Sequence, residues 1–396
     1  MKNSILILIS VAFLKLKNVG AETTADRVKS AGYLSESYNV TTRDGFRLTL
    51  FRIKKPSEPS HTQRPVALLM HGLLSSSDLW VLKGVPDLLA YALVENGYDV
   101  WLANTRGNPY GGYHPKLSLN SREYWRFSWH EIAVVDLPNI IDYVLEATQQ
   151  GTLHYVGHSQ GTTVILVLLS TYPEYSEKLR SVHLLAPVSF MENSRSTMIR
   201  ALSLPFGSYS FITPWFGDTS LLENVFIRNI LGFESCRRTE GALFICPYLF
   251  FVGFGGRSDY TLENVYPDFY STHPARCSMN QAIHFVQLYK SGHFRQFDFG
   301  TKGNEQRYNQ TTPPDYQLVN INPRFPLHLY HSKDDTFSAK EDVEHLVTLL
   351  GNKSVRHFID LNNFAHMDFV LGYNVKDVVN GDVLSEMKRV DGLLAG

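Results

Sequence analysis

Short apolar runs recur along the chain and alternate with stretches that have the composition of helices. The runs lie at residues 65–70, 98–102, 153–156, 182–185, 327–330 and 356–359. Uninterrupted apolar runs separated by helical stretches are typical of parallel strands buried on both faces of a sheet. The pattern therefore predicts an α/β fold with a mostly parallel central sheet flanked by helices.

The pattern changes between residues 189 and 314. This stretch is rich in aromatic residues, is interrupted by glycines, and shows no clear alternation of strands and helices. Neither an internal repeat nor a low-complexity linker separates two independent domains. We therefore expect an α/β core made of residues 22–188 and 315–396, with an inserted cap or lid at residues 189–314.

The first 21 residues have the features of a secretory signal peptide. Lys2 supplies a positive charge, residues 5–14 are apolar, and Val19 and Ala21 stand at positions −3 and −1 of a cleavage site. The alternative, an N-terminal membrane anchor, needs roughly 20 apolar residues, and no later stretch reaches that length. We expect cleavage after Ala21 and a secreted or lysosomal mature chain that begins at Glu22.

Charge and motifs exclude several classes of function. The chain has 37 Lys and Arg against 38 Asp and Glu, which gives a formal net charge of −1. The chain has no excess of positive charge that would attract a polyphosphate, so we expect no nucleic-acid partner. The chain has no HExxH, no Cys/His cluster and no P-loop, and Gly253-x-Gly255 lacks the rest of a dinucleotide fingerprint. We expect no metal and no organic cofactor.

Secretion through an oxidising compartment would allow glycosylation at sequons and disulfide bonds between cysteines. Asn-x-Ser/Thr triplets predict surface glycosylation at three asparagines, namely Asn39, Asn309 and Asn352. The three cysteines are Cys236, Cys246 and Cys277, which is compatible with one disulfide and one remaining thiol. Cys236 and Cys246 are closest in sequence and form the favoured pair, although the sequence leaves all three pairings open.

Residues 157–161 read Gly-His-Ser-Gln-Gly and match the G-x-S-x-G nucleophile elbow. An expected strand precedes the motif, and an apolar helix at residues 162–169 follows it, as this turn requires. The turn would expose the Ser159 hydroxyl and place the Gln160 N–H at a helix N-terminus, where it can stabilise an oxyanion. A second N–H is expected from Leu73, because His71-Gly72-Leu73 follows the strand at 65–70.

A nucleophilic serine needs a base and an acid, which follow it in the order acid and then histidine in this type of fold. Three of the 15 histidines lie after the last plausible acid. His345 belongs to a helical stretch and His357 to the last strand, whereas His366 lies on the loop after that strand. Asp334 and Asp335 both follow the preceding strand, and the residues alone do not decide which carboxylate orients His366.

Four long strings resemble the acid lipases, the family of gastric and lysosomal acid lipase and their insect relatives. They lie at residues 68–82 (LLMHGLLSSSDLWVL), 97–108 (GYDVWLANTRGN), 127–144 (FSWHEIAVVDLPNIIDYV) and 155–163 (YVGHSQGTT). Residues 32–53 resemble the N-terminal strand pair of that family. The resemblance runs from about residue 30 to the C-terminus, and it implies the α/β-hydrolase fold with an inserted cap.

The resemblance also implies roles for single residues. The family places its catalytic Asp seven residues before an Asp-Val pair, here at 342–343, which selects Asp335. Asp334 stands where the family often has Asn. His366 matches the family's His-Leu-Asp-Phe segment, and Cys236 and Cys246 match its cap disulfide.

The expected protein is therefore a lipase that hydrolyses triacylglycerols or sterol esters through an acyl-enzyme on Ser159. The alternatives are a soluble carboxylesterase for shorter esters and a lipid-binding or storage protein on a hydrolase scaffold. Residues 242–254 (ALFICPYLFFVGF) are apolar and aromatic. We expect part of this run to cover the active site in water and to face lipid when the cap shifts, with Phe250 and Phe251 as the candidate contacts.

Overall fold

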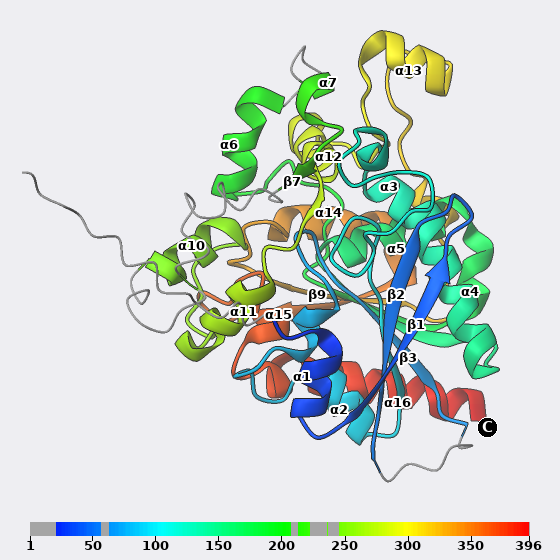
Figure 1. Ribbon diagram of the computed structural model, residues 1–396, viewed down its shortest axis with the longest axis vertical. Helices are drawn as coiled ribbons and strands as arrows, with labels where there is room; N and C mark the ends of the chain where they lie inside the picture. The colour runs from blue at the N-terminus through cyan, green and yellow to red at the C-terminus, as the bar shows by residue number, and fades with distance from the viewer. Residues whose placement is uncertain (1–20, 57–62, 207–212, 222–235, 237–244, 396) are drawn as a thin grey trace, which may run out of the picture.

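The computed structural model describes residues 21–56, 63–206, 213–221, 236 and 245–395. The expected signal peptide, apart from Ala21, and residues 242–244 of the apolar run lie outside this described part. The described chain forms an eight-stranded sheet with helices on both faces and a group of helices at one end (Figure 1).

The sheet has the strand order β1-β2-β4-β3-β5-β6-β9-β10. The strands are β1 (Leu34–Thr41), β2 (Arg47–Lys54), β3 (Val66–Met70), β4 (Asp99–Leu102), β5 (Leu153–His158), β6 (Leu179–Leu185), β9 (Leu327–Ser332) and β10 (Ser354–Ile359). β2 pairs antiparallel with both β1 and β4, and every pair from β4 to β10 is parallel. The mostly parallel sheet expected from the sequence is confirmed.

The central strands are buried on both faces, which explains their uninterrupted apolar runs. Val66, Leu68 and Met70 of β3 belong to one core cluster, whereas Ala67 and Leu69 belong to another. The first cluster includes residues of α4 (Leu137–Thr148), α5 (Gln160–Thr171) and α14 (Lys340–Leu350). The second includes residues of α1 (Thr24–Ser30), α2 (Leu89–Glu95) and α16 (Gly381–Ala395). The sheet is thus the middle layer of three.

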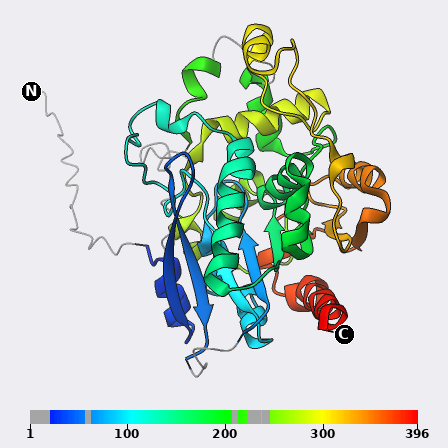
Figure 2. The same ribbon diagram turned by 90° about the vertical axis from the view of Figure 1, so that its right-hand side faces the viewer.

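The chain between β6 and β9 is mainly helical where the structure describes it. It contains α6 (Thr197–Phe206), α7 (Thr213–Phe216), α10 (Ile245–Gly253), α11 (Tyr266–Thr272), α12 (Met279–Ser291) and α13 (Gly300–Tyr308), with a short pair of strands, β7 (Ser220–Leu221) and β8 (Cys277–Ser278). Among the described residues, two further short α-helices are α3 (Trp129–Glu131) and α15 (Asp368–Leu371). Figures 1 and 2 show α6, α7 and α13 gathered at one end of the molecule. The boundaries of the expected cap at residues 189 and 314 stay a prediction.

The apolar run around α10 differs from the expectation that Phe250 contacts lipid. Residues 245–253 of the run form α10, and the ring of Phe250 is 1% exposed against Tyr266 and Phe269. Phe251 is only partly buried. The Phe250 ring therefore supports the packing of this segment, and a lipid-facing role needs residues that are exposed.

The positions of the cysteines and of the sequons are compatible with the expected disulfide and with glycosylation. The structure joins Cys236 to Cys246 with Cα atoms 5.6 Å apart, and Cys277 is a buried thiol. The three candidate glycosylation sites, Asn39, Asn309 and Asn352, are exposed.

Among the described helices, none combines the length and the apolar character needed to cross a membrane.

Four histidines form a row across neighbouring strands of the sheet. The Ser181 hydroxyl lies 2.7 Å from His154 Nδ1 and 2.8 Å from His183 Nε2. His183 stacks on His328, whose Nδ1 lies 3.0 Å from His357 Nε2. Burial lowers the pKa of His183 well below its usual range and that of His328 to about 4, so both rings are neutral near neutral pH. These histidines link strands and lie in the sheet, away from the elbow turn.

Candidate active site

Ser159 occupies a sharp turn between β5 and α5. Its φ angle is 55°, a left-handed conformation that costs a non-glycine residue about 1–3 kcal/mol. A Cβ atom on Gly157 would lie 2.7 Å from the carbonyl carbon of Gly161, and one on Gly161 would lie 2.5 Å from the Met70 carbonyl oxygen. Only glycine fits at these two positions, because the strand and the helix pass so close together.

Asp335 and His366 are in direct contact. His366 Nδ1 lies 2.7 Å from Asp335 Oδ2, and the two residues are 3% and 0% exposed. The other oxygen of Asp335 accepts hydrogen bonds from the N–H groups of Phe337 and Ser338, at 2.8 and 2.9 Å. The carboxylate is therefore held on one side by the backbone and faces the imidazole with the other.

The neighbouring acid faces a different part of the loop. Asp334 Oδ2 accepts a hydrogen bond from the backbone N–H of Asn363 at 2.8 Å. This contact joins the turn after β9 to the loop after β10. The geometry therefore pairs Asp335 with His366 and gives Asp334 a role in holding the loop.

The loop that carries His366 is fixed by groups that the sequence reasoning did not single out. His158 Nε2 lies 2.9 Å from the carbonyl oxygen of His366, and burial lowers the pKa of His158 to about 3. The neutral ring can therefore donate its Nε2–H to that carbonyl. The only signal in the sequence was the place of His158 inside the elbow motif.

Asp368 fastens the same loop to the chain between β6 and β9. It accepts hydrogen bonds from the Ala365 N–H at 2.7 Å and from the hydroxyls of Ser258 and Thr261 at 2.6 and 2.9 Å. Burial raises the pKa of Asp368 to about 6. Its signal in the sequence was its place two residues after His366, in the segment that resembles the family pattern.

The two expected oxyanion donors flank the serine. Gln160 is the first residue of α5, and Leu73 lines the same pocket as Ser159. A Cβ on Gly72 would lie 3.0 Å from Ser159 Cβ, so this loop passes directly beside the serine. His71 Nδ1 lies 2.8 Å from the Gly72 carbonyl oxygen, and burial lowers the pKa of this histidine to about 4, which fits a packing residue rather than a second base.

A glycine that follows α10 presses against the histidine loop. Gly255 has a φ angle of 104°, and a Cβ on it would lie within 3.0 Å of His366 Cβ. Its carbonyl oxygen faces the N–H groups of Thr336 and His366, at 3.3 and 3.5 Å. This residue therefore touches both the acid turn and the histidine loop.

The Gly255→Ala variant is expected to lower kcat by roughly 100-fold or more, because the added methyl group displaces His366. The Gly97→Ala variant is the matched control. Gly97 also has a positive φ angle of 88°, but no atom lies within 4 Å of a Cβ there. Both variants carry similar backbone strain. Equal kcat values on a soluble ester for the two variants would contradict a role of Gly255 in placing His366.

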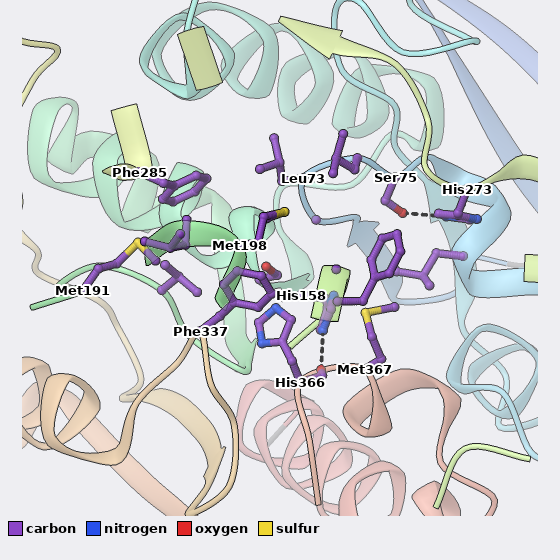
Figure 3. A pocket seen from close by; sticks show the side chains of 18 residues that line it. Leu73, Ser75, His158, Met191, Met198, His273, Phe285, Phe337, His366 and Met367 are labelled. Carbon is purple, nitrogen blue, oxygen red and sulfur yellow. Dashed lines mark hydrogen bonds between the residues drawn. The ribbon is translucent and has the colours of Figure 1, made fainter. Parts of the chain in front are cut away.

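Ser159 and His366 line the same apolar pocket (Figure 3). Its walls are mostly aliphatic, aromatic and methionine side chains, among them Leu79, Met191 and Phe285. In the described part of the chain, no group of three or more His, Cys, Asp or Glu side chains is arranged to hold a metal ion. The arrangement can present a hydroxyl nucleophile and a histidine base to an apolar substrate.

Comparisons with known proteins agree with this geometry. Residues 24–84 match the partial alpha/beta-hydrolase lipase region, and residues 65–226 match the alpha/beta hydrolase fold. The chain is 37% identical to Lipase 3 of Drosophila melanogaster, over 92% of this chain and 93% of that protein. It is 34% identical to gastric triacylglycerol lipase of Bos taurus, over 90% of this chain and 88% of that protein.

Solved structures share the fold at low sequence identity. A soluble variant of monoglyceride lipase from Saccharomyces cerevisiae, bound to a substrate analogue, superposes with a TM-score of 0.52 and 14% identity. The match covers 90% of this chain and 94% of that chain. From the fold and the identity to its relatives, the chain belongs to the acid lipase family of α/β hydrolases.

Proposed function

We propose that this protein is a lipase that hydrolyses carboxylic esters of lipids with Ser159, His366 and Asp335 as its catalytic residues. The observation that carries the proposal is the contact between His366 and a buried Asp335 at the edge of an apolar pocket that Ser159 also lines. The names of the relatives, gastric triacylglycerol lipase among them, support the same class of substrate.

The first half of the reaction forms an acyl-enzyme. Ser159 Oγ attacks the ester carbonyl carbon, and His366 Nε2 takes the hydroxyl proton. Asp335 accepts a hydrogen bond from His366 Nδ1–H, which orients the ring and stabilises the imidazolium. The N–H groups of Leu73 and Gln160 stabilise the negative oxygen of the tetrahedral intermediate. The intermediate collapses when His366 gives its proton to the departing alcohol.

The second half releases the acid. Water attacks the acyl carbon while His366 removes one of its protons, and the same two N–H groups stabilise the second oxyanion. Collapse breaks the bond to Ser159 Oγ, which recovers its proton from His366. The pocket supports this sequence because its walls beside the serine are mostly apolar, which suits an acyl chain.

Hydrolysis of p-nitrophenyl esters of graded chain length, with and without an emulsified interface, tests the proposal. A lipase is expected to prefer long chains and to gain activity at the interface. A preference for short, soluble esters would instead favour the carboxylesterase alternative. A lipid-binding or storage protein would give no turnover and no labelling by a fluorophosphonate.

The sequence supports proposals for the location of the enzyme, its cap and its glycosylation. Cleavage after Ala21 would release a secreted or lysosomal chain, with residues 189–314 as the cap. The exposure of Asn39, Asn309 and Asn352 supports glycosylation at these sites.

The cap is proposed to bind the lipid surface through exposed apolar side chains. Leu204 on α6 is 86% exposed, Trp215 on α7 is 71% exposed and Tyr248 on α10 is 65% exposed. The three helices are connected, because α6 contacts α10 and the Phe206 ring of α6 packs edge-on against Phe216 of α7. Large exposed apolar side chains grouped on neighbouring helices are typical of a surface that binds lipid.

Changing Leu204 and Trp215 to serine is expected to lower activity on emulsified long-chain esters about tenfold and to leave soluble short-chain activity unchanged. The reason is that burying these side chains in a lipid surface stabilises the adsorbed enzyme. Leu393→Ser is the control, since Leu393 is 58% exposed on α16, far from the cap in Figure 1. Equal losses on both substrates, or the same loss in the control, would contradict the interfacial role.

A further inference from the structure

The pocket around Ser159 has two dissimilar sides. In Figure 3, Met191, Met198, Phe285 and Phe337 lie on one side of His158 and His366, while Ser75 and His273 lie on the other. The first group offers apolar atoms only. The second group is a polar pair in a pocket whose other walls are mostly apolar, and the catalytic steps above use neither residue.

Ser75 and His273 are bonded to each other and buried. Ser75 Oγ lies 3.0 Å from His273 Nε2, and the residues are 6% and 1% exposed. The His273 ring also stacks on Phe269, with centroids 4.5 Å apart, which fixes its position. Placing polar groups in an apolar cavity costs free energy unless hydrogen bonds compensate it. The Ser75 hydroxyl also donates to the Ser76 carbonyl oxygen, but at 3.4 Å this bond is long. A ligand oxygen at an ordinary hydrogen-bond distance can replace it, and the hydroxyl oxygen can accept as well as donate, so the pair can serve a ligand in the pocket.

The pair is close to the reacting centre. Ser75 is three residues after Gly72, which passes directly beside Ser159. Three residues of chain span at most about 11 Å, which is the reach of a few bonds along a bound substrate. At Nδ1, His273 faces the neutral hydroxyl of Thr272 at 3.0 Å, whereas His366 faces a carboxylate. This difference favours a binding role for the pair over a second nucleophile.

The chemistry of lipid esters shows which part of a substrate suits the side of the pocket that carries Ser75 and His273. An acyl chain has no polar atom beyond its carbonyl group, so it would remove water from the pair and offer no hydrogen bond in return. The wholly apolar side suits the acyl chain. The alcohol part of a glyceride carries further ester or hydroxyl oxygens a few bonds from the reacting ester, whereas a sterol or a simple alcohol carries none.

We propose that Ser75 and His273 form a polar subsite that binds an oxygen of the glycerol backbone, so that the enzyme prefers glycerides to esters of sterols and simple alcohols. This inference rests on the proposed lipase function and specifies its substrate. The pair can form a hydrogen bond with either an ester carbonyl oxygen or a free hydroxyl of a glyceride. When His273 Nε2–H donates to Ser75, the serine O–H donates to an ester carbonyl; in the other tautomer, Ser75 donates to Nε2 and accepts from a free hydroxyl.

The test compares trioleoylglycerol and dioleoylglycerol with ethyl oleate and cholesteryl oleate in the same mixed micelles. Ser75→Ala is expected to lower kcat/KM for the two glycerides about tenfold, the effect of one lost hydrogen bond, and to leave ethyl oleate unchanged. Ser75→Thr, which keeps the hydroxyl, is expected to retain the preference for glycerides. Turnover of ethyl oleate shows that each variant has folded.

Ser181→Ala is the matched control. Ser181 is also a buried serine beside a histidine, 2.8 Å from His183 Nε2, but it lies in the sheet and is not among the residues that line the pocket. This variant is expected to leave the ratio of glyceride to ethyl oleate activity unchanged. An unchanged ratio in Ser75→Ala, or an equal loss on all four esters, overturns the subsite. A wild-type protein that hydrolyses none of the esters overturns the proposed function instead.

Discussion

Ser159→Ala is expected to lower kcat by about 10⁴-fold or more and to abolish covalent labelling by a fluorophosphonate. The substitution removes the hydroxyl proposed to form the acyl-enzyme but keeps the rest of the turn. Alanine carries a Cβ as serine does, so the strain at a φ angle of 55° is unchanged and the fold is expected to persist. Single-turnover hydrolysis of a soluble ester, together with thermal unfolding, measures both effects.

The control for this labelling experiment is the other serine of the pocket. Ser75 and Ser159 are the two serines among the described residues that line it. Ser75→Ala is expected to label normally, since its hydroxyl is assigned to binding and the probe carries no glycerol. Labelling that persists in Ser159→Ala and disappears in Ser75→Ala would exchange the roles of the two serines.

The sheet was predictable from the sequence because its central strands are buried on both faces. Such strands favour apolar side chains at nearly every position, so β3 stands out as a continuous apolar run. The helices between β6 and β9 were not predictable in the same way. α12 is buried along most of its length and includes Gln281, His284 and Gln287 among its buried residues, so it shows no single apolar face.

The active site was predictable only where a local pattern encodes it. The elbow identifies Ser159 because the crowding of strand and helix demands glycines at fixed positions. The turn after β9 offered two acids, and the residues alone left the choice open. The Ser75–His273 pair and the contact of Gly255 with His366 join segments far apart in sequence. No local pattern encodes such contacts, because they depend on how the chain between β6 and β9 packs against the loops that follow the strands.

The second large effect on kcat is expected from substitution of the acid that contacts His366. Asp335→Asn is expected to lower kcat by about 10⁴-fold, whereas Asp334→Asn is expected to cost less than tenfold. Asp334 contacts the Asn363 N–H, and an amide oxygen can accept the same hydrogen bond. Measurement of kcat for both variants on one soluble ester gives the comparison. A larger loss in Asp334→Asn would mean that the catalytic acid is the other member of the pair.

The large effect at position 335 follows from how its two oxygens are used. Oδ1 accepts from the N–H groups of Phe337 and Ser338, so the amide oxygen of an asparagine would take that place. The amide NH₂ would then face His366 Nδ1 and donate to it. His366 would be held with its proton on Nε2, the tautomer that cannot accept the proton of Ser159. The fold would keep its hydrogen bonds while the base is lost, so the thermal unfolding temperature is expected to change little.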